Sequence, residues 1–170
     1  MRWSSLALLL QRHQHIGADG SNTLGAGVVT IPMLASGVDA TAYSPVLSGT
    51  GTAGTFTYDV QVGRYCRIGP LVFYSFFVNV SAASVAPTGN MQVSLPVASA
   101  NISNLYGASA IEISGVNLTA GYSYLIARIA PNTSVISLQE VGDNVSASQY
   151  PAASVAYPWE VNGTVVYFAA

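Results

Sequence analysis

The stretch Phe56-Thr57-Tyr58-Asp59-Val60-Gln61-Val62 alternates large apolar and polar side chains at every second position. Because successive side chains of a strand point to opposite faces, this pattern predicts a strand with one apolar and one polar face. A second stretch, residues 71–80, carries large side chains at almost every position, which predicts a long strand with large residues on both faces. The two stretches together place the chain in the β class.

Working outward from these strands, the rest of the chain repeats the same pattern in shorter pieces, most of them bounded by glycine or proline. Apart from an N-terminal segment described below, the chain has no helical pattern, and residues 39–54 are rich in turn-forming residues. The sequence therefore predicts a mostly β protein, with an antiparallel β-sandwich or jelly-roll-like head. Further strands are expected at residues 65–68, 92–95, 110–114, 122–129, 134–141 and 164–168.

The N-terminal region follows a different pattern. Trp3, Leu6, Leu10 and His13 are spaced by three, four and three residues, which predicts a short helix with one apolar seam. A helix of about ten residues needs neighbours to be stable, so we expect Trp3, Leu6 and Leu10 to pack against copies of themselves in a homotrimer. We divide the chain into an N-terminal helix and arm for attachment and trimerisation, residues 1–42, and a β-sandwich head, residues 43–170.

The composition excludes several classes of function. The 170 residues include only 7% charged and 51% hydrophobic side chains, with five arginines, no lysine and a net charge of −2. Such a chain has no basic field for a phosphate backbone, so we expect no nucleic-acid partner. No stretch reaches the roughly 18 apolar residues of a membrane-spanning helix, so we expect no membrane insertion. A surface with so little charge suggests coverage by identical subunits or by a larger particle.

Catalytic groups are scarce. Only His13 and His15 could act as bases near neutral pH, and both precede the β region. The seven carboxylates are scattered, and no Gly-x-Ser-x-Gly motif is present. Cys66 is the only cysteine, which excludes an internal disulfide, and its setting between strand residues is typical of a small buried side chain. We therefore expect a protein that is not an enzyme.

His13-Gln14-His15 has a specific geometric meaning. Residues two apart in an extended segment project to the same side, so both imidazoles can face one axis. In a trimer, six imidazoles would meet there and could bind one transition-metal ion per trimer, such as iron, nickel or zinc. The alternative is that these histidines are polar residues at the end of a helix, where they suit the helix dipole.

Two segments resemble a known family. Residues 10–21, Leu-Gln-Arg-His-Gln-His-Ile-Gly-Ala-Asp-Gly-Ser, are similar to the His-x-His-x-Gly-x-Asp segment in the N-terminal attachment regions of bacteriophage fibre and other virion-surface proteins. Within residues 43–128, four stretches resemble a β-sandwich module common at the C-terminal ends of phage tail-fibre and related proteins. The resemblance implies trimerisation and an arm that anchors the protein to a phage baseplate, tail or capsid protein. The four stretches are residues 44–49, 61–69, 71–74 and 89–96.

Within this family, we expect a short trimeric tail fibre with an outward β head for host attachment, located on the virion surface after assembly in the bacterial cytoplasm. The close alternative is a trimeric capsid decoration or cement protein, which needs no shaft between arm and head. A third alternative is a secreted, lectin-like glycan-binding domain, since the chain contains six Asn-x-Ser/Thr sequons. Exposed aromatic rings suit sugar faces. The residues expected to contact a host surface polysaccharide are Tyr122, Tyr124, Tyr157 and Trp159.

Overall fold

The alternating sequence forms ten antiparallel strands in residues 40–170, the part of the chain that the computed structural model describes. A three-residue 3-10 helix, η1 (Ala152–Ser154), interrupts them once. The predicted mostly β, antiparallel fold is therefore confirmed. The strands are β1 (Thr41–Tyr43), β2 (Leu47–Gly49), β3 (Thr55–Ile68), β4 (Leu71–Val85), β5 (Met91–Ser94), β6 (Gly107–Val116), β7 (Tyr124–Ile129), β8 (Val135–Val141), β9 (Ser148–Gln149) and β10 (Val155–Phe168).

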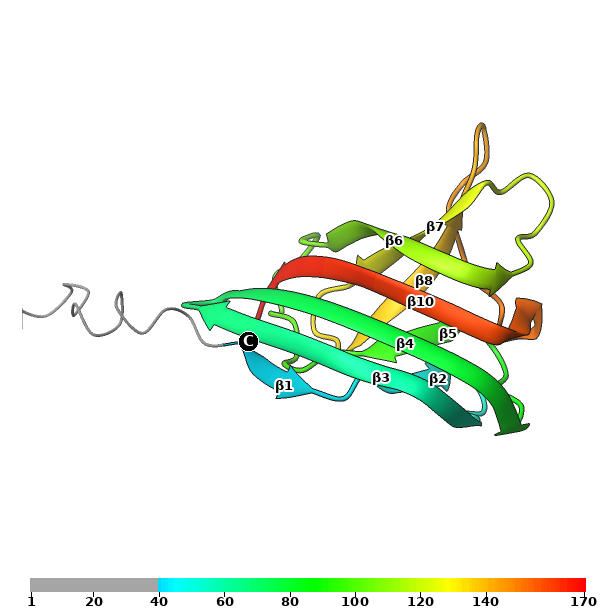
Figure 1. Ribbon diagram of the computed structural model, residues 1–170. Helices are drawn as coiled ribbons and strands as arrows, with labels where there is room; N and C mark the ends of the chain where they lie inside the picture. Colours follow the sequence, from blue (N-terminus) through cyan, green and yellow to red (C-terminus); the bar gives the residue numbers. More distant parts are fainter. Residues whose placement is uncertain (1–39) are drawn as a thin grey trace, which may run out of the picture. The chain divides into compact units, whose positions relative to one another are not determined.

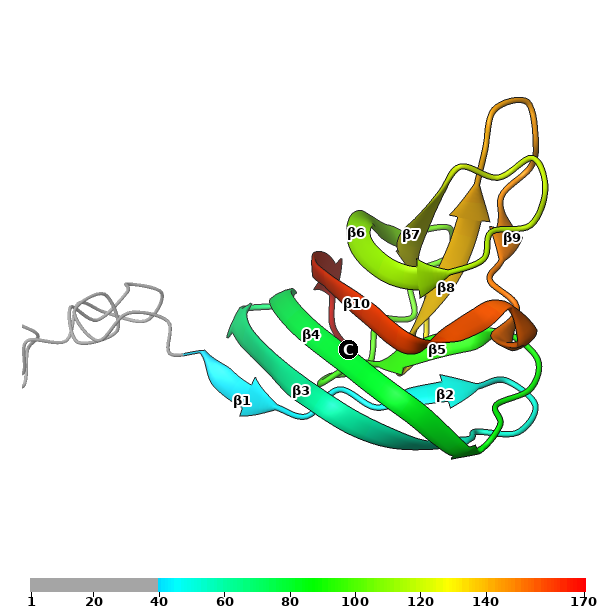
Figure 2. The ribbon, with the colours of Figure 1, turned by 45° about the vertical axis from the view of Figure 1, so that its right-hand side comes forward.

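The strands form one curled sheet rather than two separate ones. Their order is β1-β3-β4-β10-β6-β7-β8-β5-β2, with β9 paired to β8. Strand β6 makes the corner, because residues 111–116 pair with β10 while residues 107–110 pair with β7. Figure 1 shows the long strands β3, β4 and β10 side by side in front, and Figure 2 shows β5 and β8 behind them. The sheet thus folds over into a sandwich.

The inner face of the curled sheet is the hydrophobic core. Side chains at every second position of β4 and β10 point inward and are almost fully buried. Trp159 and Tyr150 stack at 6.4 Å between ring centroids, and Tyr74 stacks on Phe76 at 5.4 Å. Burying each of these large side chains contributes roughly 1.5–3 kcal/mol through the hydrophobic effect, so they anchor the two layers together.

The two ends of the strand order, β1 and β2, are neighbours in sequence, joined by residues 44–46. This crossing segment contacts both layers. The Tyr58 hydroxyl accepts from Leu47 N at 3.0 Å, and the Gln61 side chain donates to Pro45 O at 2.9 Å. On the other side, Ser94 N donates to Val46 O at 2.9 Å. The crossing segment therefore closes the open side of the sandwich.

A β-bulge in β3 reverses its alternation. Tyr58 pairs with Val80 and Val60 pairs with Asn79, so Asp59 is an extra residue on β3. Its carboxylate accepts a hydrogen bond from the Ser81 hydroxyl at 2.9 Å. An inserted residue shifts the following side chains to the opposite face. Val62 consequently lies on the outer face and is 54% exposed.

Some element boundaries differ from the sequence-based expectation. The strands expected at residues 56–62 and 65–68 are one strand, β3, which runs through Gly63. A side chain at position 63 would approach Tyr43 O within 2.9 Å, so glycine there serves close packing rather than a turn. The expected turn region 39–54 contains the short strands β1 and β2, and β10 starts nine residues before the expected strand at 164.

The N-terminal predictions fall mostly on residues that the structure does not describe. The helix, the seam of Trp3, Leu6 and Leu10, and the pair His13 and His15 all lie outside residues 40–170. The described unit begins at Ala40, and β1 spans the boundary expected between residues 42 and 43.

We expect Gly115→Ala to destabilise the fold much more than Gly69→Ala. Both glycines have a positive φ, +72° and +58°, where a side chain is strained by roughly 1–2 kcal/mol. At position 115 the added Cβ would also meet Pro158 O at 2.2 Å, whereas nothing lies within 4 Å at position 69. Urea unfolding of both variants measures the difference in the free energy of unfolding. Equal losses would contradict this account of the β6–β10 bulge.

Candidate functional site

The outer face of β3, β4 and β10 is built from the three longest strands of the described residues. Register partners form rows of outward side chains across the three strands. The row Val62–Phe77–Asn162 lies two residues from the row Arg64–Ser75–Thr164, about 7 Å away at 3.4 Å per residue. Between them runs the row Gly63–Phe76–Gly163, whose only large side chain points into the core.

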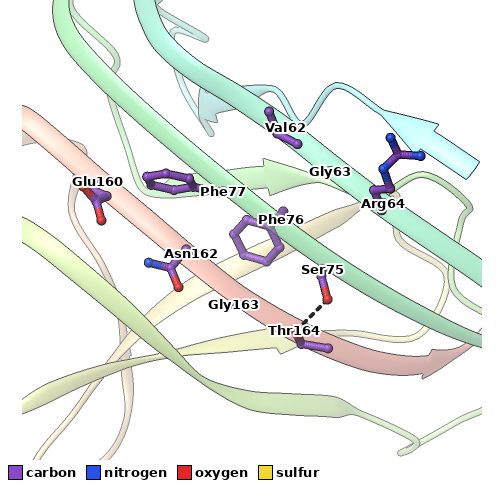
Figure 3. A pocket seen from close by; sticks show the side chains of 10 residues that line it. All are labelled: Val62, Gly63, Arg64, Ser75, Phe76, Phe77, Glu160, Asn162, Gly163 and Thr164. Carbon is purple, nitrogen blue, oxygen red and sulfur yellow. Dashed lines mark hydrogen bonds between the residues drawn. The ribbon is translucent and has the colours of Figure 1, made fainter. Parts of the chain in front are cut away.

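This arrangement leaves a hollow on the outer face with a volume of about 530 Å³. Figure 3 shows its walls: Glu160 and Asn162 lie on β10, Arg64 lies on β3 at the opposite side, and Phe77 lies between. The hollow, as the term is used below, is the space bounded by ten residues. These are Val62, Gly63, Arg64, Ser75, Phe76, Phe77, Glu160, Asn162, Gly163 and Thr164.

The polar walls of the hollow are organised by cross-strand hydrogen bonds. Ser75 and Thr164 share a hydroxyl–hydroxyl bond of 2.7 Å. The Asn79 Nδ2 atom donates to Glu160 Oε2 at 3.3 Å, and the Asn162 Nδ2 atom donates to the Glu112 carboxylate at the same distance. These bonds leave the other Glu160 oxygen and the Asn162 carbonyl oxygen as acceptors.

Two further observations concern the rim. Arg64 Nη1 donates to Ala40 O at 3.3 Å, and Figure 3 shows the Arg64 side chain extending away from Phe77 and Asn162. The Oδ1 atom of Asn79, beside Glu160, is buried and has no hydrogen-bond partner. The hollow therefore has acceptors at the β10 side and the hydroxyl pair of Ser75 and Thr164 at one end, with the apolar Val62 and Phe77 beside them.

The same face has an apolar end beyond the Arg64 row. Two successive rows there carry no charged outward side chain, and four of their six members are more than a third exposed. Contiguous apolar surfaces are typical of contacts between proteins. Cys66 belongs to it, partly exposed and not in a disulfide, so the expectation of a buried cysteine is wrong. The apolar end consists of Cys66, Ile68, Leu71, Phe73, Val166 and Phe168.

One of the aromatic residues expected to contact a glycan, Trp159, is buried in the core. Trp159 is 0% exposed, packs in the core against Tyr150, and its Nε1 atom is buried with no hydrogen-bond partner. The expectation that Trp159 faces a ligand at the surface is therefore wrong. The reason is the register of β10, in which Trp159 pairs with the inward-facing Val80.

The other three aromatic candidates are accessible but lie outside the hollow. Tyr124, at the start of β7, is 54% exposed, and Tyr157 on β10 is 38% exposed. Tyr122 lies in the preceding loop, where its hydroxyl donates to Ser146 O at 3.1 Å. None of the three lines the hollow, so their expected role in glycan contact stays a prediction.

The residues of the hollow were not singled out by their sequence pattern. The missed signal is Glu160-Val161-Asn162-Gly163-Thr164-Val165, which alternates polar and small or apolar residues. Reading β10 back to residue 155 would have placed Glu160, Asn162 and Thr164 on one face.

Two other kinds of site are absent from the described residues. Within residues 40–170, no group of three or more histidine, cysteine, aspartate or glutamate side chains is placed to bind a metal ion. No helix in this part of the chain has the length and apolar character needed to cross a membrane.

Comparison with known proteins adds a likeness of fold. No family model and no curated protein matches the chain. Among solved structures, the crystal structure of the Dettilon tailspike protein (gp208) matches with a TM-score of 0.59 and 17% identity, over 76% of this chain. The match covers 24% of the tailspike chain. At this identity the likeness shows a shared fold, so this β unit has the fold of a part of a tailspike protein.

We expect the fold to lose stability steeply above pH 10. Burial raises the pKa of Tyr150 to about 12 and that of Tyr167 to about 12, despite hydrogen bonds that act in the opposite direction. Below pH 10 both phenols are neutral in the folded and unfolded chain. Between pH 10 and 12 the unfolded chain loses these protons first, so each tyrosine removes up to about 3 kcal/mol of stability. Urea unfolding at pH 8 and pH 11.5 measures this loss, and a flat profile would contradict it.

Proposed function

We propose that this chain is a non-enzymatic structural protein of a phage virion, and specifically a short trimeric tail fibre. Its N-terminal arm would attach it to the baseplate or tail, and its β unit would face the host surface. The observation that carries the proposal is the fold that the described residues share with a part of a tailspike protein. Fold alone does not fix function, so the proposal also draws on sequence and surface.

The residues that resemble phage fibre modules support the proposal through their positions. Residues 44–49 contain the crossing segment and β2, and residues 89–96 contain β5, which pairs with β2. The stretches 61–69 and 71–74 form the β3–β4 hairpin and its turn. The resemblance thus coincides with the elements that close the sandwich, as expected for a shared module.

A homotrimer is part of the proposal, with the apolar end as a contact between copies. Side chains such as Phe73 and Phe168 expose apolar area on a chain with 7% charged residues. Burying that area against identical copies would remove it from water and needs no other partner. The uncharged rows also avoid the desolvation of buried ions at such a contact.

The N-terminal arm completes the proposal outside the described residues. Trp3, Leu6 and Leu10 would form the seam of a three-helix contact, and His13 and His15 from three chains would supply six imidazoles. Such a set of nitrogen ligands fits iron, nickel or zinc. The ion would cross-link the three arms, and the imidazoles would hold it in their neutral form.

Immunoelectron microscopy of the phage that encodes this chain should label the tail tip with antibodies against the purified protein. Binding of an anti-capsid antibody to the same particles serves as the control for labelling. Label over the head would instead support the capsid decoration alternative. Virions without label would contradict the proposal, and so would a protein found only outside particles.

We also expect the full chain to have three times its 17.6 kDa mass in light scattering. A Phe73→Ser, Phe168→Ser variant should dissociate at higher concentration than the wild type, because it loses two apolar contacts in each copy. Tyr124→Ser removes a more exposed ring from another strand and controls for general effects. If the double variant dissociates at the same dilution as the control, the apolar end is not the contact.

A further inference from the structure

We propose that the hollow on β3, β4 and β10 binds a neutral sugar unit of a glycan. The inference rests on the proposed function only for its source, a host surface polysaccharide. The binding chemistry follows from the walls of the hollow itself.

The size and openness of the hollow suit part of a chain-like ligand. Its volume of about 530 Å³ lies within the roughly 300–1,000 Å³ typical of small-molecule sites. It lies on a sheet face and is walled by two rows of side chains, so a polymer could continue past it in either direction. The floor row Gly63–Phe76–Gly163 occupies inward-facing positions of the three strands, so no side chain rises from it into the middle of the hollow.

One wall provides a surface for the C–H face of a sugar ring. Val62 is 54% exposed, and the Phe77 ring lies beside it as its register partner. Both point outward because of the bulge at Asp59 and the alternation of β4. Apolar and aromatic surfaces of this kind bind ligands whose faces carry C–H groups.

The polar walls suit hydroxyl groups better than a charged group. A hydroxyl both donates and accepts, so neighbouring hydroxyls of one ligand could donate to Glu160 or the Asn162 carbonyl oxygen and accept from the remaining hydroxyl proton of the Ser75–Thr164 pair. The Ser75–Thr164 pair offers further acceptor lone pairs on the floor side. Because Asn79 and Asn162 hold the two carboxylates in place, the acceptors are positioned before a ligand arrives.

Charge and backbone geometry argue against other ligands. Arg64 is balanced by Glu160, and Glu112 adds a negative charge beside Asn162, so an anion would meet net repulsion. A peptide that adds to a sheet needs a free strand edge. Strand β4 is paired on both sides, with β3 and β10, so its backbone has no groups left for such a strand.

The test is saturation-transfer NMR with the full chain and four probes: the methyl glycosides of glucose, galactose, mannose and N-acetylglucosamine. Ring C–H protons of at least one probe should receive saturation from the wild type. Phe77→Thr replaces the ring with a small β-branched residue that suits a strand and should weaken binding roughly tenfold, equivalent to about 1.4 kcal/mol. Glu160→Gln should weaken it several-fold, because the amide accepts less strongly.

Tyr124→Ala tests the other expected contact with a glycan, and Tyr106→Ala is the matched control, since it removes a more exposed ring that does not line the hollow. The Tyr106 variant should bind as the wild type does. Thermal unfolding of each variant verifies that the fold persists. The inference is overturned if no probe receives saturation, or if binding depends on Tyr124 and not on Phe77. It is also overturned if the Phe77 or Glu160 variant changes the mass of the assembly, since the hollow would then be a contact between copies.

These outcomes separate the inference from the proposed function. If the protein is found on the virion tail and the wild type binds no sugar, only the proposed sugar site is contradicted. If sugar binding depends on Phe77 but the protein is absent from virions, the sugar site is supported and the proposed phage role is contradicted.

Discussion

The curl of the sheet depends on one covalent constraint. Strands β1 and β2 end the strand order, yet only residues 44–46 separate them in the chain. A flat sheet would hold these edges many strands apart, at about 4.8 Å for each strand. The sheet must therefore return on itself, which buries its inner face and removes much of the edge that could pair with another chain. Val46 N in the crossing segment donates to the Ser94 hydroxyl, and Leu47 N directly after it donates to the Tyr58 hydroxyl, which holds this closure in place.

Which side chains lie on the outer face of β3 depends on a second feature, the extra residue Asp59. Beyond it, the inward positions of β3 are Gln61 and Gly63, which serve the crossing segment: Gln61 binds Pro45 O, and Gly63 leaves room for Tyr43. The outward positions then receive Val62 and the side chains that follow it. One inserted residue thus satisfies the closure and also supplies an apolar wall of the hollow. The apolar end has the same origin on its β3 side.

Local alternation predicted most strands and the fold class, because it depends only on which side chains a strand buries. It could not reveal what depends on distant partners. The alternation from Phe56 to Val62 predicts that their apolar side chains share one face, but the bulge at Asp59 moves Val62 to the exposed outer face. Trp159 resembles a surface aromatic until its pairing with Val80 is known. The sequence pattern predicted only the last part of β10, because proline and glycine, here Pro158 and Gly163, normally interrupt strands. In the structure, Pro158 lies at a bulge and Gly163 lies close to Ile111. The hollow was missed because its walls come from three strands far apart in sequence.

The two areas of the outer face have complementary consequences if both are used as proposed. The apolar end and the hollow share β3, β4 and β10, and the row Arg64–Ser75–Thr164, which lines the hollow, lies next to the apolar end. A contact between copies at the apolar end would hold three hollows at fixed positions on one rigid body. A shallow site that meets a sugar with few groups binds weakly by itself. Three such sites on one polymer raise the effective concentration for the second and third contacts, so avidity can exceed the single-site affinity by roughly 10²–10⁴. Placing the hollow one row from the contact between copies is therefore what would let a low-charge, open surface attach firmly to a repetitive glycan.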